Sequence, residues 1–262
     1  MVPNRMSNLL YQADYYSDRH ERTFAAAKRI LTTIGLILPG PIRSAVDVGC
    51  GVGTWLAVLL EDGCHDVLGY EGDWVPTEYL RIPANRLIRC DVAQGVIADR
   101  RFDLAMSLEC AEHLPPEAAD RFVASLCKLS DFVLFSAAIP NQTGEVHINE
   151  QWPEYWARLF AERSYVCLDW IRPQVWRDES IPWWYRQNTV LFVRSERRPE
   201  MKPLHQNDDI LPLPLVHPNM LKMWVEWVEA PSRSVSIKQA LRQLISTTIH
   251  KLGRYGVNRS RA

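Results

Sequence analysis

The chain has 262 residues, with 30 Lys and Arg against 31 Asp and Glu, so its net charge is close to zero. That balance gives no global attraction to nucleic acid or to a membrane surface. A hydrophobic content of 47% is enough for a substantial core, and the length suits one α/β domain with appendages.

The six cysteines include no Cys-x-x-Cys pair, and several stand inside apolar runs. This pattern predicts reduced, buried thiols in a cytoplasmic protein rather than disulfides or a zinc site. The polar start, residues 1–8, predicts no signal peptide. The longest apolar stretch, 30–38, is far shorter than the roughly 20 residues that a membrane span needs.

Apolar periodicity and turn residues predict an alternation of helices and strands. The expected helices cover residues 7–38, 55–61, 117–129 and 153–163. The expected strands cover residues 45–49, 66–70, 86–90, 102–107, 132–136, 165–171 and 189–193. This order predicts an α/β fold: a Rossmann-like, seven-stranded, mostly parallel sheet with helices on both faces. Ligands of such sheets bind beyond the carboxyl ends of the strands.

The sequence predicts three regions. Residues 1–40 form an N-terminal helical cap, 41–196 the Rossmann-like domain, and 197–262 a linker with a basic, helical C-terminal extension. Residues 232–262 hold seven Lys or Arg and no acidic residue. Three interpretations stay open for this extension: a solvated helix packed on the domain, weak contact with an anionic membrane surface, or contact with nucleic acid or a partner.

The most informative segment follows the first strand, where Gly49, Gly51 and Gly53 alternate with other residues after Asp47. Glycines let the backbone turn sharply and approach a ligand, and the next helix presents free N–H groups there. Two acidic residues, Glu71 and Asp91, end the second and third strands. A carboxylate at such a strand end can accept hydrogen bonds from ribose hydroxyls.

These motifs resemble the class I methyltransferases, in which the glycine turn faces S-adenosylmethionine. The resemblance implies that Glu71 binds the ribose and that Asp91, with the Val92 backbone, lies near the adenine. It also implies that the final strand is antiparallel. The implied cofactor-binding residues are Asp47, Gly49, Cys50, Gly51, Gly53, Thr54, Trp55, Glu71, Gly72, Asp73, Trp74, Asp91, Val92, Leu108 and Glu109.

Chemistry is expected after the fourth strand, where Glu109, Glu112 and His113 share one side if the segment is helical. His113 can act as a general base, as can His147. The segment is similar to the Glu-x-x-Glu-His stretch of ubiquinone and small-RNA O-methyltransferases, some of which hold magnesium. That likeness makes Glu109, Glu112, His113 and His147 candidate ligands of a divalent cation. A third interpretation is that the segment only lines the cofactor pocket.

Aromatic residues alternate with Asn, Gln and Arg in segments 141–152 and 173–188. Such surfaces suit a sugar or another flat polar acceptor, and Tyr11, Tyr15, Tyr16 and His20 are expected to cover the same mouth. The segments resemble bacterial methyltransferases of type 23 or type 12. That resemblance implies methyl transfer to an O or N atom of a small-molecule or saccharide acceptor, in glycan or secondary-metabolite biosynthesis.

Three alternatives remain beside this enzyme. A nucleotide-dependent dehydrogenase is disfavoured by the glycine spacing and by the missing Tyr-x-x-x-Lys relay. The second is a non-catalytic S-adenosylmethionine-binding partner of a biosynthetic complex. The third is a metal-assisted O-methyltransferase that acts on RNA.

Overall fold

The computed structural model describes residues 13–203 and 214–229. The chain divides into two units, Met1–His217 and Pro218–Ala262. Helix α7 (Pro218–Glu229) belongs to the second unit. The basic segment 232–262 and Tyr11 lie outside the described residues, so the predictions for them stay predictions.

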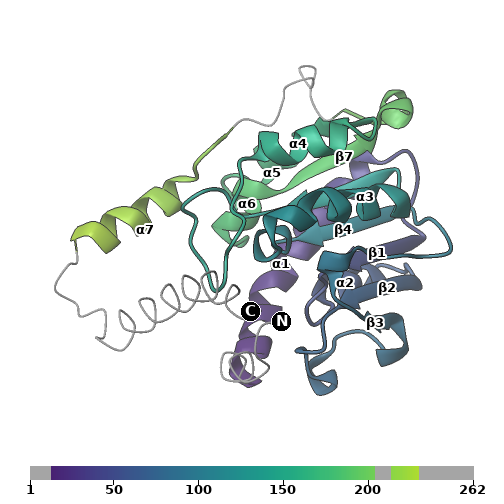
Figure 1. The fold of residues 1–262 in the computed structure, drawn as a ribbon, viewed down its shortest axis with the longest axis horizontal. Helices are drawn as coiled ribbons and strands as arrows, with labels where there is room; N and C mark the ends of the chain where they lie inside the picture. The colour runs from purple at the N-terminus through teal and green to yellow at the C-terminus, as the bar shows by residue number, and fades with distance from the viewer. Residues whose placement is uncertain (1–12, 204–213, 230–262) are drawn as a thin grey trace, which may run out of the picture. The chain divides into compact units, whose positions relative to one another are not determined.

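One seven-stranded sheet forms the centre of the first unit (Figure 1). Its strands are β1 (Ser44–Val48), β2 (Asp66–Glu71), β3 (Leu87–Arg89), β4 (Leu104–Leu108), β5 (Phe132–Ser136), β6 (Tyr165–Leu168) and β7 (Val190–Arg194). The order is β3-β2-β1-β4-β5-β7-β6, and β7 is antiparallel to both of its neighbours, β5 and β6. The predicted Rossmann-like, mostly parallel sheet and its antiparallel strand are confirmed.

Three predicted strands are longer than the observed ones. The third, expected over residues 86–90, covers only Leu87–Arg89. The fourth begins at Leu104, because Phe102 makes only an isolated bridge to Ser130. The sixth ends at Leu168, four residues before helix α5. The helices of the first unit are α1 (Ala13–Ile37), α2 (Thr54–Glu61), α3 (Ala119–Leu129), α4 (Pro153–Ala161), α5 (Arg172–Val175) and α6 (Trp183–Asn188). Short 3-10 turns include η4 (Val92–Gln94), η5 (Ala111–His113) and η7 (Ser195–Glu200).

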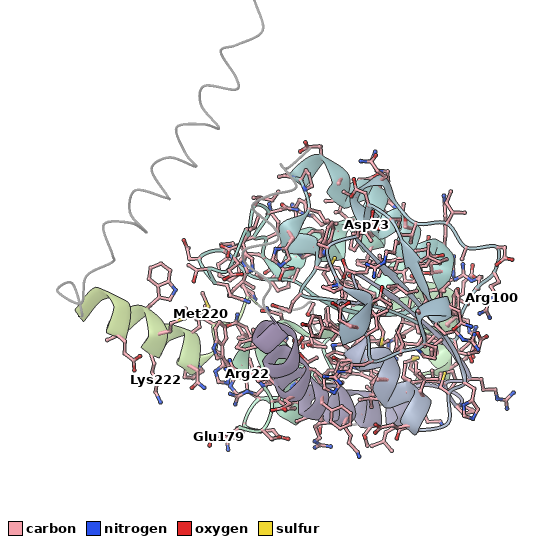
Figure 2. All side chains as sticks on the ribbon, turned by 90° about the horizontal axis from the view of Figure 1, so that it is seen from below. Arg22, Asp73, Arg100, Glu179, Met220 and Lys222 are labelled. Carbon is pink, nitrogen blue, oxygen red and sulfur yellow. The ribbon has the colours of Figure 1, made fainter. Side chains whose placement is uncertain are left out.

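Helices cover both faces of the sheet, because successive strand residues point to opposite sides. In β1, Ala45 belongs to a buried cluster that also contains residues of α1 and α2. The next residue, Val46, belongs to a second cluster with residues of α3 and α4. Charged side chains such as Arg100 and Glu179 lie at the surface instead (Figure 2).

Packing against α1 continues after β7. Met201 is buried, and the N–H of Lys202 donates to the Ile37 carbonyl at 2.9 Å. The proposed domain boundary after residue 196 therefore stays a prediction. No described helix is both long and apolar enough to cross a membrane.

The sheet brings distant segments to one edge. Strands β2, β1, β4 and β5 run parallel, so their carboxyl ends meet there. Because β7 is antiparallel to β5, the α6 residues that precede β7 return to the same edge. The residues that directly follow these parallel strands are thus placed on one rim of the domain.

The buried apolar cluster that contains residues of α3 and α4 gives a stability prediction. Phe160 is fully buried, and its ring stacks on Phe192 with centroids 3.7 Å apart. Phe160→Ala should lower the free energy of unfolding by about 3–5 kcal/mol, through lost contacts and the cavity left behind. Urea unfolding with an unchanged m-value measures this loss. Ile97, which is 90% exposed, gives the control: Ile97→Ala should change stability by less than about 0.5 kcal/mol. A Phe160→Ala loss as small as that of the control would contradict the packing.

Candidate functional site

The turn after β1 is built from three left-handed glycines, Gly49, Gly51 and Gly53, with φ of 80°, 56° and 83°. Side chains disfavour this conformation. A Cβ on Gly49 would lie 2.3 Å from the Cys110 Sγ, whereas a Cβ on Gly51 would meet nothing within 4 Å. Gly51 therefore borders open space at the carboxyl end of β1, beside the first N–H groups of α2.

Glu71 ties this turn to the end of β2. Its Oε2 accepts a hydrogen bond from the Gly51 N–H at 2.7 Å, and its Oε1 accepts one from the Gly72 N–H, also at 2.7 Å. The side chain is buried. The structure thus brings together the glycine turn and the first predicted ribose-binding acid.

Asp47 lies under the same turn and is 1% exposed. Its Oδ1 has no hydrogen-bond partner among the described residues. Burial, and secondarily the charge of Glu71, raise the pKa of Asp47 well above its usual value. Buried acceptors in native proteins nearly always have a donor, and the ammonium group of a bound amino acid would supply one here.

The other predicted cofactor residues have mixed surroundings. Thr54 faces the N-terminal helix, with its Oγ1 3.0 Å from the His20 Nδ1. Trp55 is buried in the core, where its ring meets Tyr185 edge-on at 5.4 Å. Cys50 is also buried, which raises the pKa of its thiol well above the usual value. These three side chains support the turn rather than face open space.

The segment after β2 and β3 is more exposed. The Trp74 ring lies over Gly72, because a Cβ there would be 2.1 Å from it, and 48% of Trp74 is exposed. Asp73 and Asp91 are exposed as well. Asp91 Oδ1 accepts from the Ala93 N–H at 3.0 Å and so caps η4, whose first residue Val92 is buried. Trp74 offers a flat apolar surface beside the Glu71 carboxylate.

Glu109 follows Leu108 at the end of β4 and adopts a left-handed φ of 51°. Its N–H donates to both the Ser136 carbonyl and the Ser136 Oγ, each at 3.0 Å. Its carboxylate accepts from the Asn188 Nδ2 and from the Gln142 Nε2, both at 3.1 Å. Burial raises the pKa of Glu109 above its ordinary value.

Sequence reasoning missed Gln142, Gln187 and Asn188 as a buried amide network. Gln142 Oε1 accepts from the Asn188 Nδ2 at 2.9 Å and from the Gln187 Nε2 at 3.1 Å. Gln187 Oε1 accepts from the His217 N–H at 2.7 Å. The signal that could have indicated this network is the position of its members in the chain. Gln142 follows β5, and Gln187 and Asn188 directly precede the antiparallel β7.

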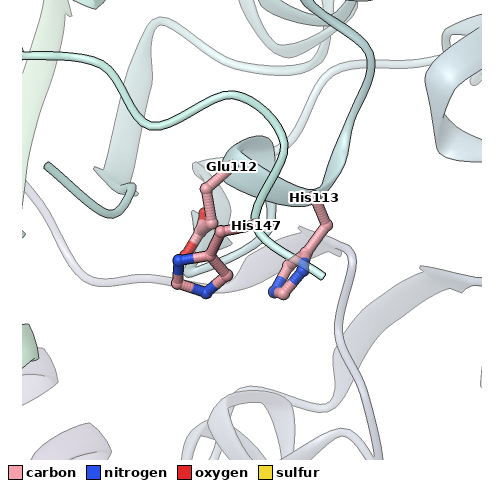
Figure 3. A group of neighbouring side chains, drawn as sticks. All are labelled: Glu112, His113 and His147. Atoms are coloured by element: carbon pink, nitrogen blue, oxygen red, sulfur yellow. The ribbon is translucent and has the colours of Figure 1, made fainter. Parts of the chain in front are cut away.

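A separate group of possible metal ligands consists of Glu112, His113 and His147 (Figure 3). One ligand atom from each of these residues lies within 4.8 Å of the others, and the two imidazole centroids are 4.9 Å apart. The His147 Nδ1 is 2.9 Å from Glu150 Oε1. The loop is held in place because the N–H groups of residues 148 and 149 donate to the Glu112 carbonyl, at 2.9 and 3.0 Å.

Glu109 is not a member of this cluster. Its spacing from Glu112 and His113 would put all three on one side of a regular helix, but η5 covers only Ala111–His113. The left-handed Glu109 lies before that turn and directs its carboxylate to the amide network. The structure thus groups three of the four predicted metal ligands.

Comparisons with known proteins agree with this fold. Residues 15–188 match a family model described as a methyltransferase domain. No curated protein sequence matches the chain. The plantazolicin methyltransferase BpumL, solved with a desmethyl substrate analogue and S-adenosylhomocysteine (SAH), is 14% identical, with TM-score 0.50, over 74% of this chain and 91% of that one.

Two further solved structures are similar. A structure described as a complex between the Haloferax volcanii Trm112 methyltransferase activator and the putative methyltransferase is 13% identical, with TM-score 0.50, over 70% of this chain and 94% of that one. The magnesium protoporphyrin IX methyltransferase of Synechocystis PCC 6803, with bound SAH, is 19% identical, with TM-score 0.46, over 67% and 84%. The two structures with a TM-score of 0.50, at these identities, show a shared fold.

Proposed function

Because the chain belongs to the methyltransferase-domain family and is an S-adenosylmethionine-dependent methyltransferase, we propose that it methylates an O or N atom of a small-molecule or saccharide acceptor. The observation that carries the proposal is the site formed by the open Gly51, the buried Glu71 and the unpartnered Asp47 Oδ1 at one strand edge. None of these three features calls for a phosphate group in the ligand.

The residues fit S-adenosylmethionine group by group. Asp47 would accept from its amino group, the turn at Gly49 and Gly51 would adjoin its amino-acid chain, and Glu71 would accept from its ribose hydroxyls. Trp74 and Asp91 would flank the adenine. When bound, the cofactor supplies a methyl group that is already activated for transfer. The chain's own contribution is then mainly to position the acceptor and exclude water.

Two histidines are available as proton acceptors. The rings of His113 and His147 meet edge-on, and neither residue is fully buried. A neutral imidazole can take a proton from a hydroxyl or an amine as a general base. We assign the general-base role to this pair, with Glu150 orienting the His147 ring through its Nδ1.

The acceptor side combines apolar and polar groups. Val146, Ile148 and Trp152 are exposed large apolar side chains on the loop that carries His147. A surface of this kind suits the C–H faces of a sugar or another small acceptor. We assign acceptor binding in the cytoplasm to this loop, with a role in glycan or secondary-metabolite biosynthesis.

A specific observation favours metal assistance as a second candidate. Glu112, His113 and His147 offer one carboxylate and two imidazole ligands within 4.8 Å. Such a set suits a divalent cation, which would orient an acceptor hydroxyl and promote its deprotonation. This candidate corresponds to an O-methyltransferase, including one that acts on RNA.

Gly51→Ala tests the cofactor site. A Cβ at Gly51 would project into open space, so the variant should fold and lose about 1 kcal/mol because of its left-handed φ. It should weaken SAH binding by about tenfold or more, since the added methyl group occupies space that the ligand needs. Isothermal titration with SAH measures the affinity, and urea unfolding measures the stability.

Gly63→Ala is the matched control. Gly63 also has a left-handed φ, 90°, and a Cβ there would also meet nothing within 4 Å, but it follows α2 at the opposite edge. Its variant should show the same loss of stability with unchanged SAH affinity. If both variants bind SAH like the wild type, Gly51 does not border the cofactor.

The metal candidate makes a separate prediction. After treatment with EDTA and its removal, Mg²⁺ or Mn²⁺ should raise the thermal unfolding temperature, because a ligand that binds only the folded state stabilises it by about 2.7 kcal/mol at 100 times its Kd. His147→Ala should abolish the shift. The exposed His65 gives the control: His65→Ala should keep it. An equal shift in all three proteins would rule out a site at His147.

A further inference from the structure

Glu109 combines two features that cost free energy. Its left-handed backbone, with φ 51°, is uncommon for a residue with a side chain. Its carboxylate lies in a desolvated position, which raises the pKa of the group. Strain and desolvation of this kind persist where surrounding contacts enforce them, and they concentrate at functional sites.

The surrounding contacts hold the carboxylate without neutralising it. The side chains that donate hydrogen bonds to it, Asn188 and Gln142, are uncharged amides. Among the described residues, no Lys or Arg forms an ion pair with Glu109. The two buried arginines of the α5–α6 region bind elsewhere: Arg172 to Asp169 and Arg186 to the Trp176 carbonyl. His147 acts on the Glu109 carboxylate electrostatically, but no described Lys or Arg pairs with it, so a positively charged ligand would find a carboxylate held only by uncharged amides.

Glu109 also lies beside the cofactor turn. The next residue, Cys110, approaches Gly49 so closely that a Cβ there would meet its Sγ at 2.3 Å. Glu109 is partly exposed, whereas Glu112 is fully buried. A group bound next to the transferred methyl can therefore reach the Glu109 carboxylate.

From this geometry, and resting on the proposed function, we infer that Glu109 is an acceptor-binding residue that selects an amine, so that the methyl group is transferred to nitrogen. The amine binds as an ammonium ion paired with Glu109 and gives one proton to His113. The nitrogen lone pair then forms the bond to the methyl carbon. The carbon–sulfur bond breaks with its electron pair on sulfur, and the nitrogen regains a positive charge.

Electrostatics favours nitrogen over oxygen. In N-methylation positive charge moves from sulfur to the acceptor, and a fixed carboxylate at the acceptor stabilises that charge in the transition state. An oxygen acceptor becomes more negative as it loses its proton. A desolvated carboxylate beside it would then repel the developing charge. Gln142 and Asn188 act as positioning residues, because they keep the Glu109 carboxylate at this place.

Two cofactor analogues that differ by one amine test the inference. Sinefungin carries a primary amine at the position of the transferred methyl group, and SAH carries nothing there. Titration of the wild-type protein in EDTA should show sinefungin binding at least about tenfold more tightly than SAH, as expected for a charge-assisted hydrogen bond. Glu109→Gln should remove that preference while SAH affinity stays within about threefold.

The exposed Glu117 provides the matched control: Glu117→Gln should keep the wild-type ratio of affinities. Equal affinity of the wild type for the two analogues overturns the inference, and that arm needs no variant. An unchanged ratio in Glu109→Gln overturns it as well. A preference that appears only with added Mg²⁺ assigns it to a metal ion instead. Failure to bind either analogue would instead contradict the proposed cofactor site.

Discussion

The hydrogen bond from the Gly51 N–H to Glu71 is the contact on which the cofactor side depends. It joins the turn after β1 to the end of β2, two segments that the parallel register already brings to the same edge. The cost of the arrangement is electrostatic, because Asp47 and Glu71 are both buried and the charge of Glu71 raises the pKa of Asp47. Backbone N–H groups compensate Glu71, whereas Asp47 keeps an oxygen without a described donor. A ligand with a positively charged amino group would relieve that imbalance.

The proposed acceptor site around Glu109 depends on tertiary contacts between segments that are distant in the chain. Glu109 and Gln142 lie in two loops and Asn188 ends helix α6, so they are far apart in the chain, and they meet because β7 runs antiparallel to β5. Buried polar networks of this kind fix a unique geometry when each member has its partners. The network continues through Gln187 to the His217 N–H, so the last described residue of the first unit is bound to the same cluster.

The sequence predicted what is encoded locally. Alternating glycines after an apolar strand, and Glu71 at the end of the next one, predicted a turn that meets an acidic strand end, because each signal lies within a few residues of its strand. The structure joins the two, and their role in cofactor binding stays a prediction. The amide network has no such signal, since Gln142 and Asn188 are 46 positions apart and meet through tertiary structure. The grouping of Glu109 with Glu112 and His113 assumed helical spacing, and the left-handed φ of Glu109 separates it from them. Trp55 followed the glycine motif but packs into the core, where burial of its ring determines its orientation.

The Glu109 carboxylate and the pair of histidines both depend on the loop that contains residues 141–150. Asn141, Thr143 and Val146 have left-handed φ values of 66°, 58° and 61°, a conformation that costs about 1–2 kcal/mol for each side-chain-bearing residue. Glu150 offsets this strain, because its carboxylate accepts from the N–H groups of Asn141 and Thr143 at 2.7 and 2.8 Å and contacts His147. The same loop carries Gln142 to Glu109 and His147 to His113. In the proposed function, acceptor recognition and proton removal would therefore be coupled, because a change in the loop that moved His147 would also displace Gln142, which holds the Glu109 carboxylate.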